Sequence, residues 1–370
     1  MAKSIRLQTL PILPPSAIVG CAQCAFREPC GGMDGQQTFW GCFEACATEC
    51  SAESSCDLAC PRRPDYIDLL REVGGLRAPA GPVRPLTHPN LPLYIPMIRH
   101  GFDRHHCVST PFVALSIRDV LKMDSRGRYR PVAGSGAELR ERFGLRPDAM
   151  VLVVSVAPDE YIERYWRFRR RDDTPTAIAA LELAGMTAPN YSFFERVPRT
   201  HTLRNRARML RVAEELSYAG VKTVLHLNAE VPADWRYWTA LLKEHTNIRY
   251  ISKEFQTGLK VRSKGQAQIV AMRRLQDDIG RALHPIVVGG MAYVRLLQSG
   301  FPHGFTLVDS TPFLKTMSRH KRVQRGESFV WEKHPTAHGA PLDELLEDNI
   351  KKHVAHIKKL VPGKDMGVAA

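Results

Sequence analysis

Short apolar runs alternate with longer segments of helical periodicity over most of the chain. Most of these runs are rich in β-branched residues and stop at a turn residue, which is the pattern of buried parallel strands. The pattern predicts strands at 93–98, 111–117, 150–156, 188–193, 222–227, 248–252, 284–288 and 305–308. It predicts helices between them at 136–143, 159–171, 176–183, 201–218, 233–244, 265–283 and 291–298.

Eight strands that alternate with helices predict an α/β fold, a (β/α)8 barrel of the TIM type. We expect this catalytic domain to span residues 93–335, preceded by a helix at 64–73 and a Gly/Pro-rich linker that together fill 63–92. Residues 336–370 are expected to form a Lys-rich amphipathic C-terminal helix and a tail.

Residues 1–62 have a different composition and predict a small Cys-rich metal-binding module. Eight of the nine cysteines of the chain lie there. We expect no signal peptide before them, which favours metal ligation over disulfides. Eight thiolates suit two four-ligand sites, which would hold either iron–sulfur clusters or zinc. The predicted ligands are Cys21, Cys24, Cys30, Cys42, Cys46, Cys50, Cys56 and Cys60.

The charge of the chain points to an anionic partner. The formal net charge is +14, which favours nucleic acid among possible partners. No apolar run approaches the roughly 18 residues that a transmembrane helix requires, and prolines interrupt the apolar N-terminal stretch. We therefore expect a cytoplasmic protein without a membrane partner, and its oligomeric state stays open.

Polar residues follow almost every predicted strand, at the end of a barrel where enzymes carry their chemistry. We take Asp309, Glu254 and Asp159 as candidate acid, base or nucleophilic groups, although Asp309 and Asp159 could each simply cap the helix that follows. The candidate substrate-binding residues are Asn190, Ser192, His226, Asn228, Gln256, Gly289, Gly290 and Ser310.

Arginines cluster with aromatic residues near this end of the predicted barrel. Arginine beside an aromatic ring suits contact with a phosphate and stacking on a base. The alternative is a solvated helix face. The candidate nucleic-acid contacts are Arg169, Arg170, Arg171, Arg199 and Arg319.

The stretch 284–320 resembles the tRNA-guanine transglycosylase superfamily, including the branch that inserts 7-deazaguanine into DNA. A strand that ends at Gly289-Gly290, a helix that ends near Gly300 and a strand that ends in Asp309-Ser310-Thr311-Pro312 follow the order of the family pattern. The resemblance implies that Asp309 is the nucleophile. The Asp-Ser-Gly-Gly-Phe-Gln element of the family is absent, and no cysteine follows Cys107, where the tRNA enzymes bind zinc.

The resemblance implies a base exchange in which guanine is replaced by a free 7-deazaguanine through a covalent aspartyl intermediate. The missing zinc cysteines favour DNA over tRNA as the substrate. Two other functions stay open on the sequence alone. One is an iron–sulfur oxidoreductase of the radical type with a TIM-like barrel, and the other is a non-catalytic, metal-containing nucleic-acid-binding protein.

Overall fold

The computed structural model describes residues 56, 58–60, 63–76, 81, 83–88, 90–193, 197–337 and 339–361. These residues form two compact units. The smaller unit holds the described residues up to 76 together with 192–193, 197–208 and 228–238, and the larger unit holds 81–191, 209–227 and 239–361. Six of the eight predicted metal ligands, Cys21 to Cys50, lie outside the described residues.

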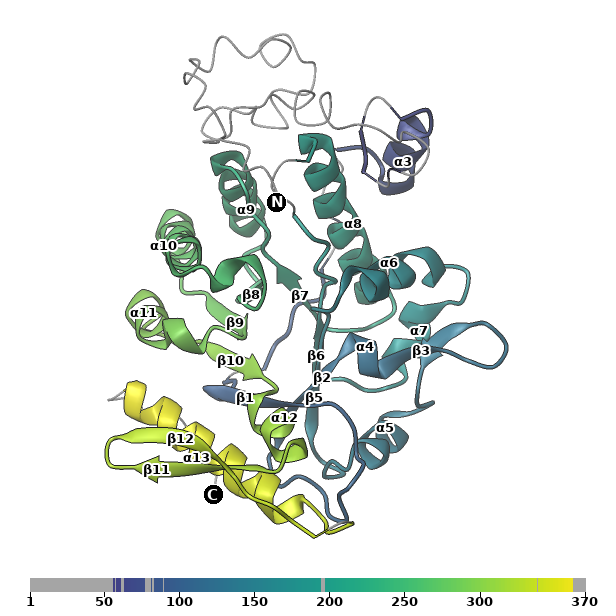
Figure 1. The fold of residues 1–370 in the computed structure, drawn as a ribbon. Helices are drawn as coiled ribbons and strands as arrows, with labels where there is room; N and C mark the ends of the chain where they lie inside the picture. The colour runs from purple at the N-terminus through teal and green to yellow at the C-terminus, as the bar shows by residue number, and fades with distance from the viewer. Residues whose placement is uncertain are drawn as a thin grey trace, which may run out of the picture. The chain divides into compact units, whose positions relative to one another are not determined.

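The larger unit contains a closed barrel of eight parallel strands (Figure 1). In order around the barrel they are β1 (Tyr94–Ile98), β2 (Phe112–Ser116), β5 (Met150–Val154), β6 (Gly185–Thr187), β7 (Thr223–His226), β8 (Tyr250–Glu254), β9 (His284–Val288) and β10 (Thr306–Asp309). Strand β10 pairs with β1 and closes the barrel. The predicted TIM-like α/β fold is therefore confirmed.

Helices follow most of the strands. They are α4 (Ile117–Val120), α5 (Gly136–Arg142), α6 (Asp159–Phe168), α7 (Thr174–Ala179), α8 (Arg199–Tyr218), α9 (Pro232–Glu244), α10 (Arg262–Ile279), α11 (Val294–Gly300), α12 (Thr311–Met317) and α13 (Asp343–Leu360). The smaller unit contributes α3 (Tyr66–Val73), and the short 3-10 helices are η2 (Gly258–Lys260) and η3 (Met291–Tyr293). The connection from β1 to β2 contains no helix.

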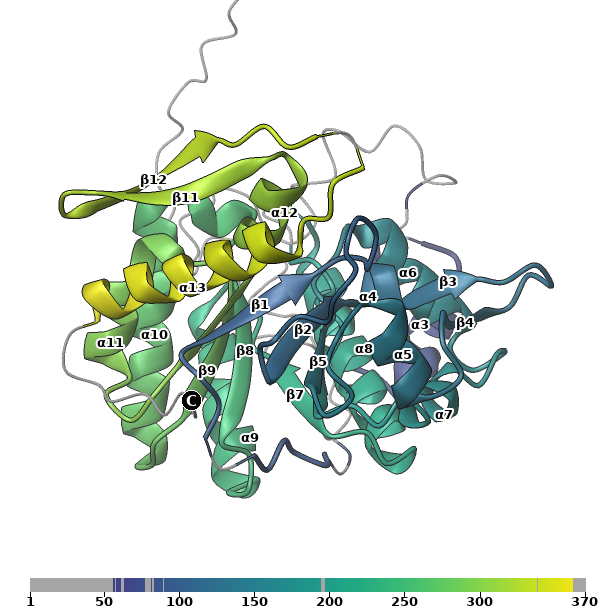
Figure 2. The same ribbon diagram turned by 90° about the horizontal axis from the view of Figure 1, so that it is seen from below.

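Two antiparallel hairpins, β3–β4 (Leu121–Met123 and Tyr129–Pro131) and β11–β12 (His320–Arg325 and Ser328–Lys333), were not predicted. The hairpin β11–β12 lies over α13, and α13 runs beside β1 (Figure 2). No helix follows β1, and the C-terminal helix α13 contacts the outer side of β10 and β1, where His353 lies against Asp309 and Tyr94.

One strand prediction was wrong. The sheet contains Gly185–Thr187 and not 188–193, because Pro189 has no N–H for the ladder and ends the strand. Strand β8 also extends two residues further than predicted, so Glu254 is its last residue and lies inside the strand.

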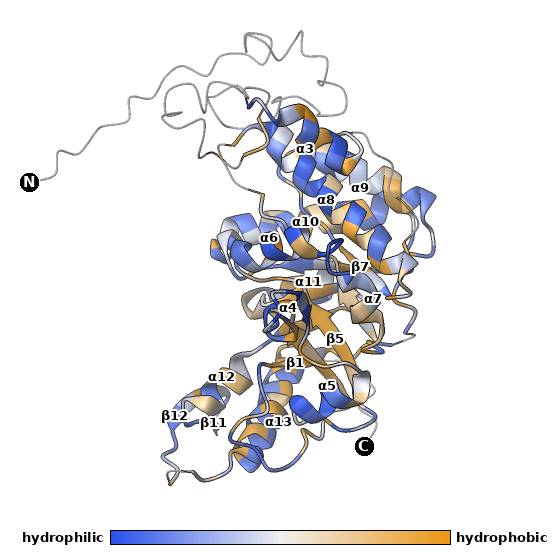
Figure 3. Ribbon diagram, turned by 90° about the vertical axis from the view of Figure 1, so that its right-hand side faces the viewer, coloured by the Kyte–Doolittle hydropathy of each residue, from blue (hydrophilic) through white to orange (hydrophobic). Residues whose placement is uncertain are grey.

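The apolar pattern that predicted the strands reflects burial on both faces. In the hydropathy colouring β1 and β5 are apolar along their length, whereas α13 carries both apolar and polar residues (Figure 3). This is the expected difference between a buried parallel strand and an amphipathic covering helix.

Candidate active site

The strand register determines which residues face the inside of the barrel. One buried cluster holds alternate side chains from seven of the strands, which is possible only in the barrel interior. The cluster comprises Leu86, Leu91, Ile95, Met97, Ala114, Leu152, Val154, Val224, Tyr250, Ile286, Val288 and Val308. Any strand residue that pairs with a member of this cluster shares its face, and the residue next to it in the chain faces outward.

Glu254 faces the interior at the carboxyl end of β8. It pairs in register with Val288, a member of the interior cluster. The carboxylate is 6% exposed and is held by the turn that follows it. The Thr257 N–H donates to Oε1 over 3.1 Å, the Thr257 hydroxyl donates to the same oxygen, and the Gln256 N–H lies 3.4 Å from Oε2. Because the two donors of Thr257 occupy Oε1, Oε2 is the less constrained oxygen.

The glycine pair after β9 packs against this turn. Gly289 and Gly290 both have φ of +79°, a conformation that favours glycine. A Cβ on Gly289 would lie 2.8 Å from the Gln256 Cγ atom, and one on Gly290 would lie 2.7 Å from the Val287 Cγ1 atom. The pair therefore lets the backbone after β9 approach the turn that holds Glu254.

A second polar pair lies deeper in the barrel. His226 on β7 pairs in register with Ser252 on β8, and Ser252 pairs with the interior residue Ile286. The Ser252 hydroxyl and the His226 Nδ1 atom are 3.1 Å apart. Burial, together with the positive charge of Lys253, lowers the pKa of His226 to about 3. The imidazole is therefore neutral at physiological pH.

Asp309 faces away from the interior. It pairs with Pro96, while its neighbour Val308 pairs with Ile95, and both Val308 and Ile95 belong to the interior cluster. The Asp309 Oδ1 atom accepts the N–H of Thr311 over 2.6 Å at the start of α12. Asp309 precedes Ser310, the N-cap residue, and its side chain accepts the first N–H of α12, which is close to the capping role that the sequence left as an alternative to catalysis. The structure does not bring Asp309 and Glu254 to the same face.

The other Asp309 oxygen takes part in a buried chain of polar groups outside the barrel. The His353 Nε2 atom lies 3.3 Å from Asp309 Oδ2, and the Arg322 guanidinium lies 2.9 Å from His353 Nδ1. Arginine can only donate, so Nδ1 accepts and the ring proton lies on Nε2. Burial favours a raised pKa for Asp309, but the hydrogen bonds from His353 and Thr311 outweigh it, and the pKa of this carboxyl is lowered.

The remaining candidates at the strand ends have mostly structural contacts. Asn190 donates its N–H to the Ser155 carbonyl, and Ser310 is the N-cap residue of α12. In the smaller unit, the carbonyl of Ser192 accepts from Asn205, and that of Asn228 accepts from the Trp238 indole. Asp159 is exposed and begins α6.

The candidate arginines of the larger unit differ in exposure. Arg169 is buried and donates to Glu215 over 2.7 Å, and Arg170 binds the other oxygen of the same carboxylate. Arg171 is exposed and pairs with Asp172. Arg319 is half-buried, has φ of 55° and donates to the carbonyl of Met317.

Arg199 belongs to the smaller unit and is also buried. Its guanidinium pairs with the carboxylate of Asp234 and donates to the hydroxyl of Thr202 over 3.0 Å. Among these five arginines, Arg169 and Arg199 could contact a polyanion only after a rearrangement, because their charges are buried in ion pairs.

Of the predicted metal ligands, the structure describes Cys56, which is half-buried, and Cys60, which is buried. No three His, Cys, Asp or Glu side chains come together as a metal site within the described ranges. Because the other six cysteines lie outside those ranges, the metal module stays a prediction.

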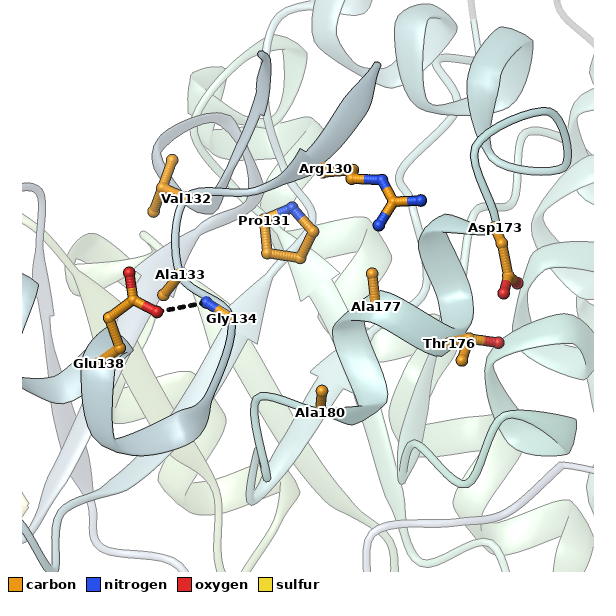
Figure 4. A pocket seen from close by; sticks show the side chains of 10 residues that line it. All are labelled: Arg130, Pro131, Val132, Ala133, Gly134, Glu138, Asp173, Thr176, Ala177 and Ala180. Atoms are coloured by element: carbon orange, nitrogen blue, oxygen red, sulfur yellow. Dashed lines mark hydrogen bonds between the residues drawn. The ribbon is translucent and has the colours of Figure 1, made fainter. Parts of the chain in front are cut away.

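A surface pocket of about 540 Å³ lies on the flank of the larger unit (Figure 4). One wall is the segment that leads from β4 into α5, where Glu138 accepts the Gly134 N–H over 2.6 Å. The other wall is the start of α7, with Asp173 and Thr176. None of the predicted site residues lines this pocket, so we do not place the active site there.

Comparison with known proteins gives no family assignment. No protein-family model matches the chain, and no match is found among curated proteins. In the part of the chain that the structure describes, every helix is too short or too polar to cross a bilayer.

Proposed function

We propose that this protein is an enzyme that exchanges a base in a nucleic acid, by glycosyl transfer at the carboxyl end of the barrel. The observation that supports this most directly is Glu254, a buried carboxylate on the inner face at the end of β8. TIM-barrel enzymes take their catalytic residues from the carboxyl ends of the strands. The net charge of +14 fits an anionic polymer as the substrate.

The proposed reacting group is Glu254 rather than Asp309. Oε2 of Glu254 attacks C1′ of the target nucleotide, and the bond between C1′ and the base breaks with its electron pair on the leaving base. The incoming 7-deazaguanine then attacks C1′ and releases Glu254. The incoming base gives up a ring N–H proton and the outgoing base takes one up, so protons balance over the exchange. Asp159, exposed at the start of α6, is the proposed group for this proton transfer.

The resemblance of residues 284–320 to the transglycosylase superfamily supports this reaction class. Gly289 and Gly290 pack against the turn that holds Glu254, so this glycine element borders the proposed site. Asp309 would then hold the end of β10 from outside the barrel, through Thr311 and His353. We propose a structural role for the metal of the Cys-rich module, which would be iron–sulfur or zinc. Its ligands would be the eight cysteines from Cys21 to Cys60.

The test is base exchange and adduct trapping with single-stranded DNA and RNA. We expect wild-type protein to incorporate labelled guanine or 7-deazaguanine and to give a mass adduct when it is denatured without an incoming base. Glu254→Gln should lose at least about 10³-fold of the activity and all of the adduct. Asp309→Asn is the matched control and should keep the adduct. If the adduct persists in Glu254→Gln and vanishes in Asp309→Asn, Asp309 is the nucleophile. If neither wild type nor any variant exchanges a base, the proposed function is rejected.

A further inference from the structure

An aromatic side chain and two arginines meet at the carboxyl end of adjacent strands β2 and β5. Tyr161 lies in the first turns of α6, which begins five residues after β5. The Arg118 guanidinium of α4, the helix that directly follows β2, lies 5.9 Å from the centre of the Tyr161 ring. The Arg164 guanidinium lies 5.7 Å from the same ring. Figure 2 shows α4 next to α6.

These contacts are as long as those of Arg249 with Tyr250, at 5.6 Å, and of Arg322 with Phe329, at 5.7 Å, and longer than the closest arginine–aromatic contacts of the larger unit. Arg169 lies 3.3 Å from the ring centre of Trp166, and Arg171 lies 4.3 Å from that of Phe168. At nearly 6 Å, neither Arg118 nor Arg164 is in stacking contact with Tyr161, although each is close enough for attraction by the ring. Tyr161 is half-buried, so part of the residue is accessible to a ligand.

The charges of both arginines are available for a ligand. Arg164 forms no hydrogen bond or ion pair within the residues that the structure describes. The nearest carboxylate to Arg118 is Asp119, at 3.6 Å, and Asp119 is already bound by the guanidinium of Arg99. Arg118 is 36% exposed. Two positive charges thus flank one tyrosine ring without a full ion pair of their own.

We propose that Tyr161, Arg118 and Arg164 form a platform for single-stranded nucleic acid, on which Tyr161 stacks an unpaired base and the two arginines bind flanking phosphates. Arg164 is three residues after Tyr161 and shares its helix face. Glu160 is four residues before Arg164 and so neighbours it on α6, but no ion pair joins the two within the residues that the structure describes. A ring with flanking cations is the usual arrangement for binding single strands without sequence preference.

The platform deepens the proposed function, on which it rests for the identity of the substrate. In the circular strand order, β2 lies opposite β8, the strand of Glu254. A strand held over β2 and β5 would therefore border the barrel opening across from the proposed reacting carboxylate. An unpaired nucleotide beside the stacked base could enter the opening without the cost of leaving a duplex.

Binding can be tested without catalysis, by fluorescence anisotropy with labelled oligonucleotides of about 12 nucleotides. DNA and RNA single strands share the recognised chemistry, so both are used, with a DNA duplex as a third probe. Wild type should bind single strands more tightly than the duplex. Tyr161→Ala should weaken single-strand binding about 5- to 100-fold, and Tyr161→Phe should bind as wild type.

Arg118→Gln and Arg164→Gln should each reduce the slope of log K against log salt by about 0.7. The matched control is Arg274→Gln, an exposed arginine of α10, which should change neither the affinity nor the slope. Tyr161→Leu keeps apolar bulk without an aromatic ring, so it decides the question if Tyr161→Ala does not fold. Wild-type binding by Tyr161→Leu, or an equal loss in Arg274→Gln, would overturn the platform.

The two proposals fail separately. Glu254→Gln should bind single strands as wild type does but form no adduct. Strong single-strand binding that depends on Tyr161, without base exchange by any form of the protein, would reject the reaction and leave the platform standing. Base exchange at wild-type rates in Tyr161→Leu at low oligonucleotide concentration would reject the platform and leave the reaction standing.

Discussion

His353 holds Asp309 from outside the barrel. The His353 Nε2 atom lies 3.3 Å from the Asp309 Oδ2 atom, and both side chains are buried. The two residues are 44 positions apart, on α13 and at the end of β10. Arg322 of β11 binds the other ring nitrogen, so a carboxylate, an imidazole and a guanidinium form one buried chain. This chain ties the C-terminal helix and hairpin to the last strand of the barrel.

Asp309→Asn should destabilise the fold by about 1–3 kcal/mol. An asparagine amide presents an NH2 group where the carboxylate accepted, so it cannot accept from both Thr311 and His353. The measurement is urea denaturation near pH 7. Asp277→Asn is the control, because Asp277 is 58% exposed and its loss should change the stability by less than about 0.5 kcal/mol. Equal effects of the two variants would contradict the structural role of Asp309.

The stabilisation by Asp309 should depend on pH. Its pKa is lowered in the folded protein, so the contribution is complete above the ordinary aspartate value of about 3.9 and is lost as the pH falls through the lower, folded value. The difference in unfolding free energy between wild type and Asp309→Asn should therefore shrink below about pH 4. A difference that grows on acidification would contradict the lowered pKa.

Arg169 and Arg170 provide a matched pair, because both bind Glu215. The Arg169 side chain is 3% exposed and that of Arg170 is 58% exposed. Arg169→Gln should lower the free energy of unfolding by about 3 kcal/mol, because it leaves the shielded carboxylate of Glu215 with a poorer partner. Arg170→Gln should lower the free energy of unfolding by less than about 1 kcal/mol. Thermal and urea unfolding measure both, and similar losses would show that exposure does not separate the two arginines.

Gly289→Ala should reduce base exchange more than it reduces stability. The new methyl group would lie 2.8 Å from the Gln256 Cγ atom and disturb the turn that holds Glu254. Gly280→Ala is the control, because Gly280 has φ of 69° but open space around a Cβ, so it tests backbone strain alone. The comparison uses the exchange rate and the melting temperature of each variant. Equal exchange rates in the two variants would separate the glycine pair from the proposed site.

The Cys-rich module should hold metal in two sites. We expect elemental analysis of anaerobically purified protein to give zinc or iron, and a visible absorption band only in the second case. Cys46→Ser should lower the metal content, whereas Cys107→Ser should not, because Cys107 lies outside the cluster of eight. Less than one metal ion per chain, together with intact disulfides, would reject the module.

The sequence by itself determined the fold class. Buried parallel strands are apolar on both faces, so runs such as that of β9 stand out without any knowledge of their partners. Helical periodicity located most of the helices between them to within a few residues. The short hairpins and the place of β6 were missed, because three-residue strands such as β3 give too little pattern to recognise.

Because these strands are buried on both faces, the sequence did not show whether the carboxylates at the strand ends point into the barrel or away from it. In a strand that is apolar on both faces, alternation gives no sign of which residue points inward, so Asp309 and Glu254 looked equivalent. Only the register with neighbouring strands places Glu254 inside and Asp309 outside. Residues distant in the chain determined the contacts of the arginines. Arg169 forms a buried ion pair with Glu215, and Arg118 of α4 lies near Tyr161 of α6. Such contacts depend on how the helices pack around the barrel, which local pattern does not encode.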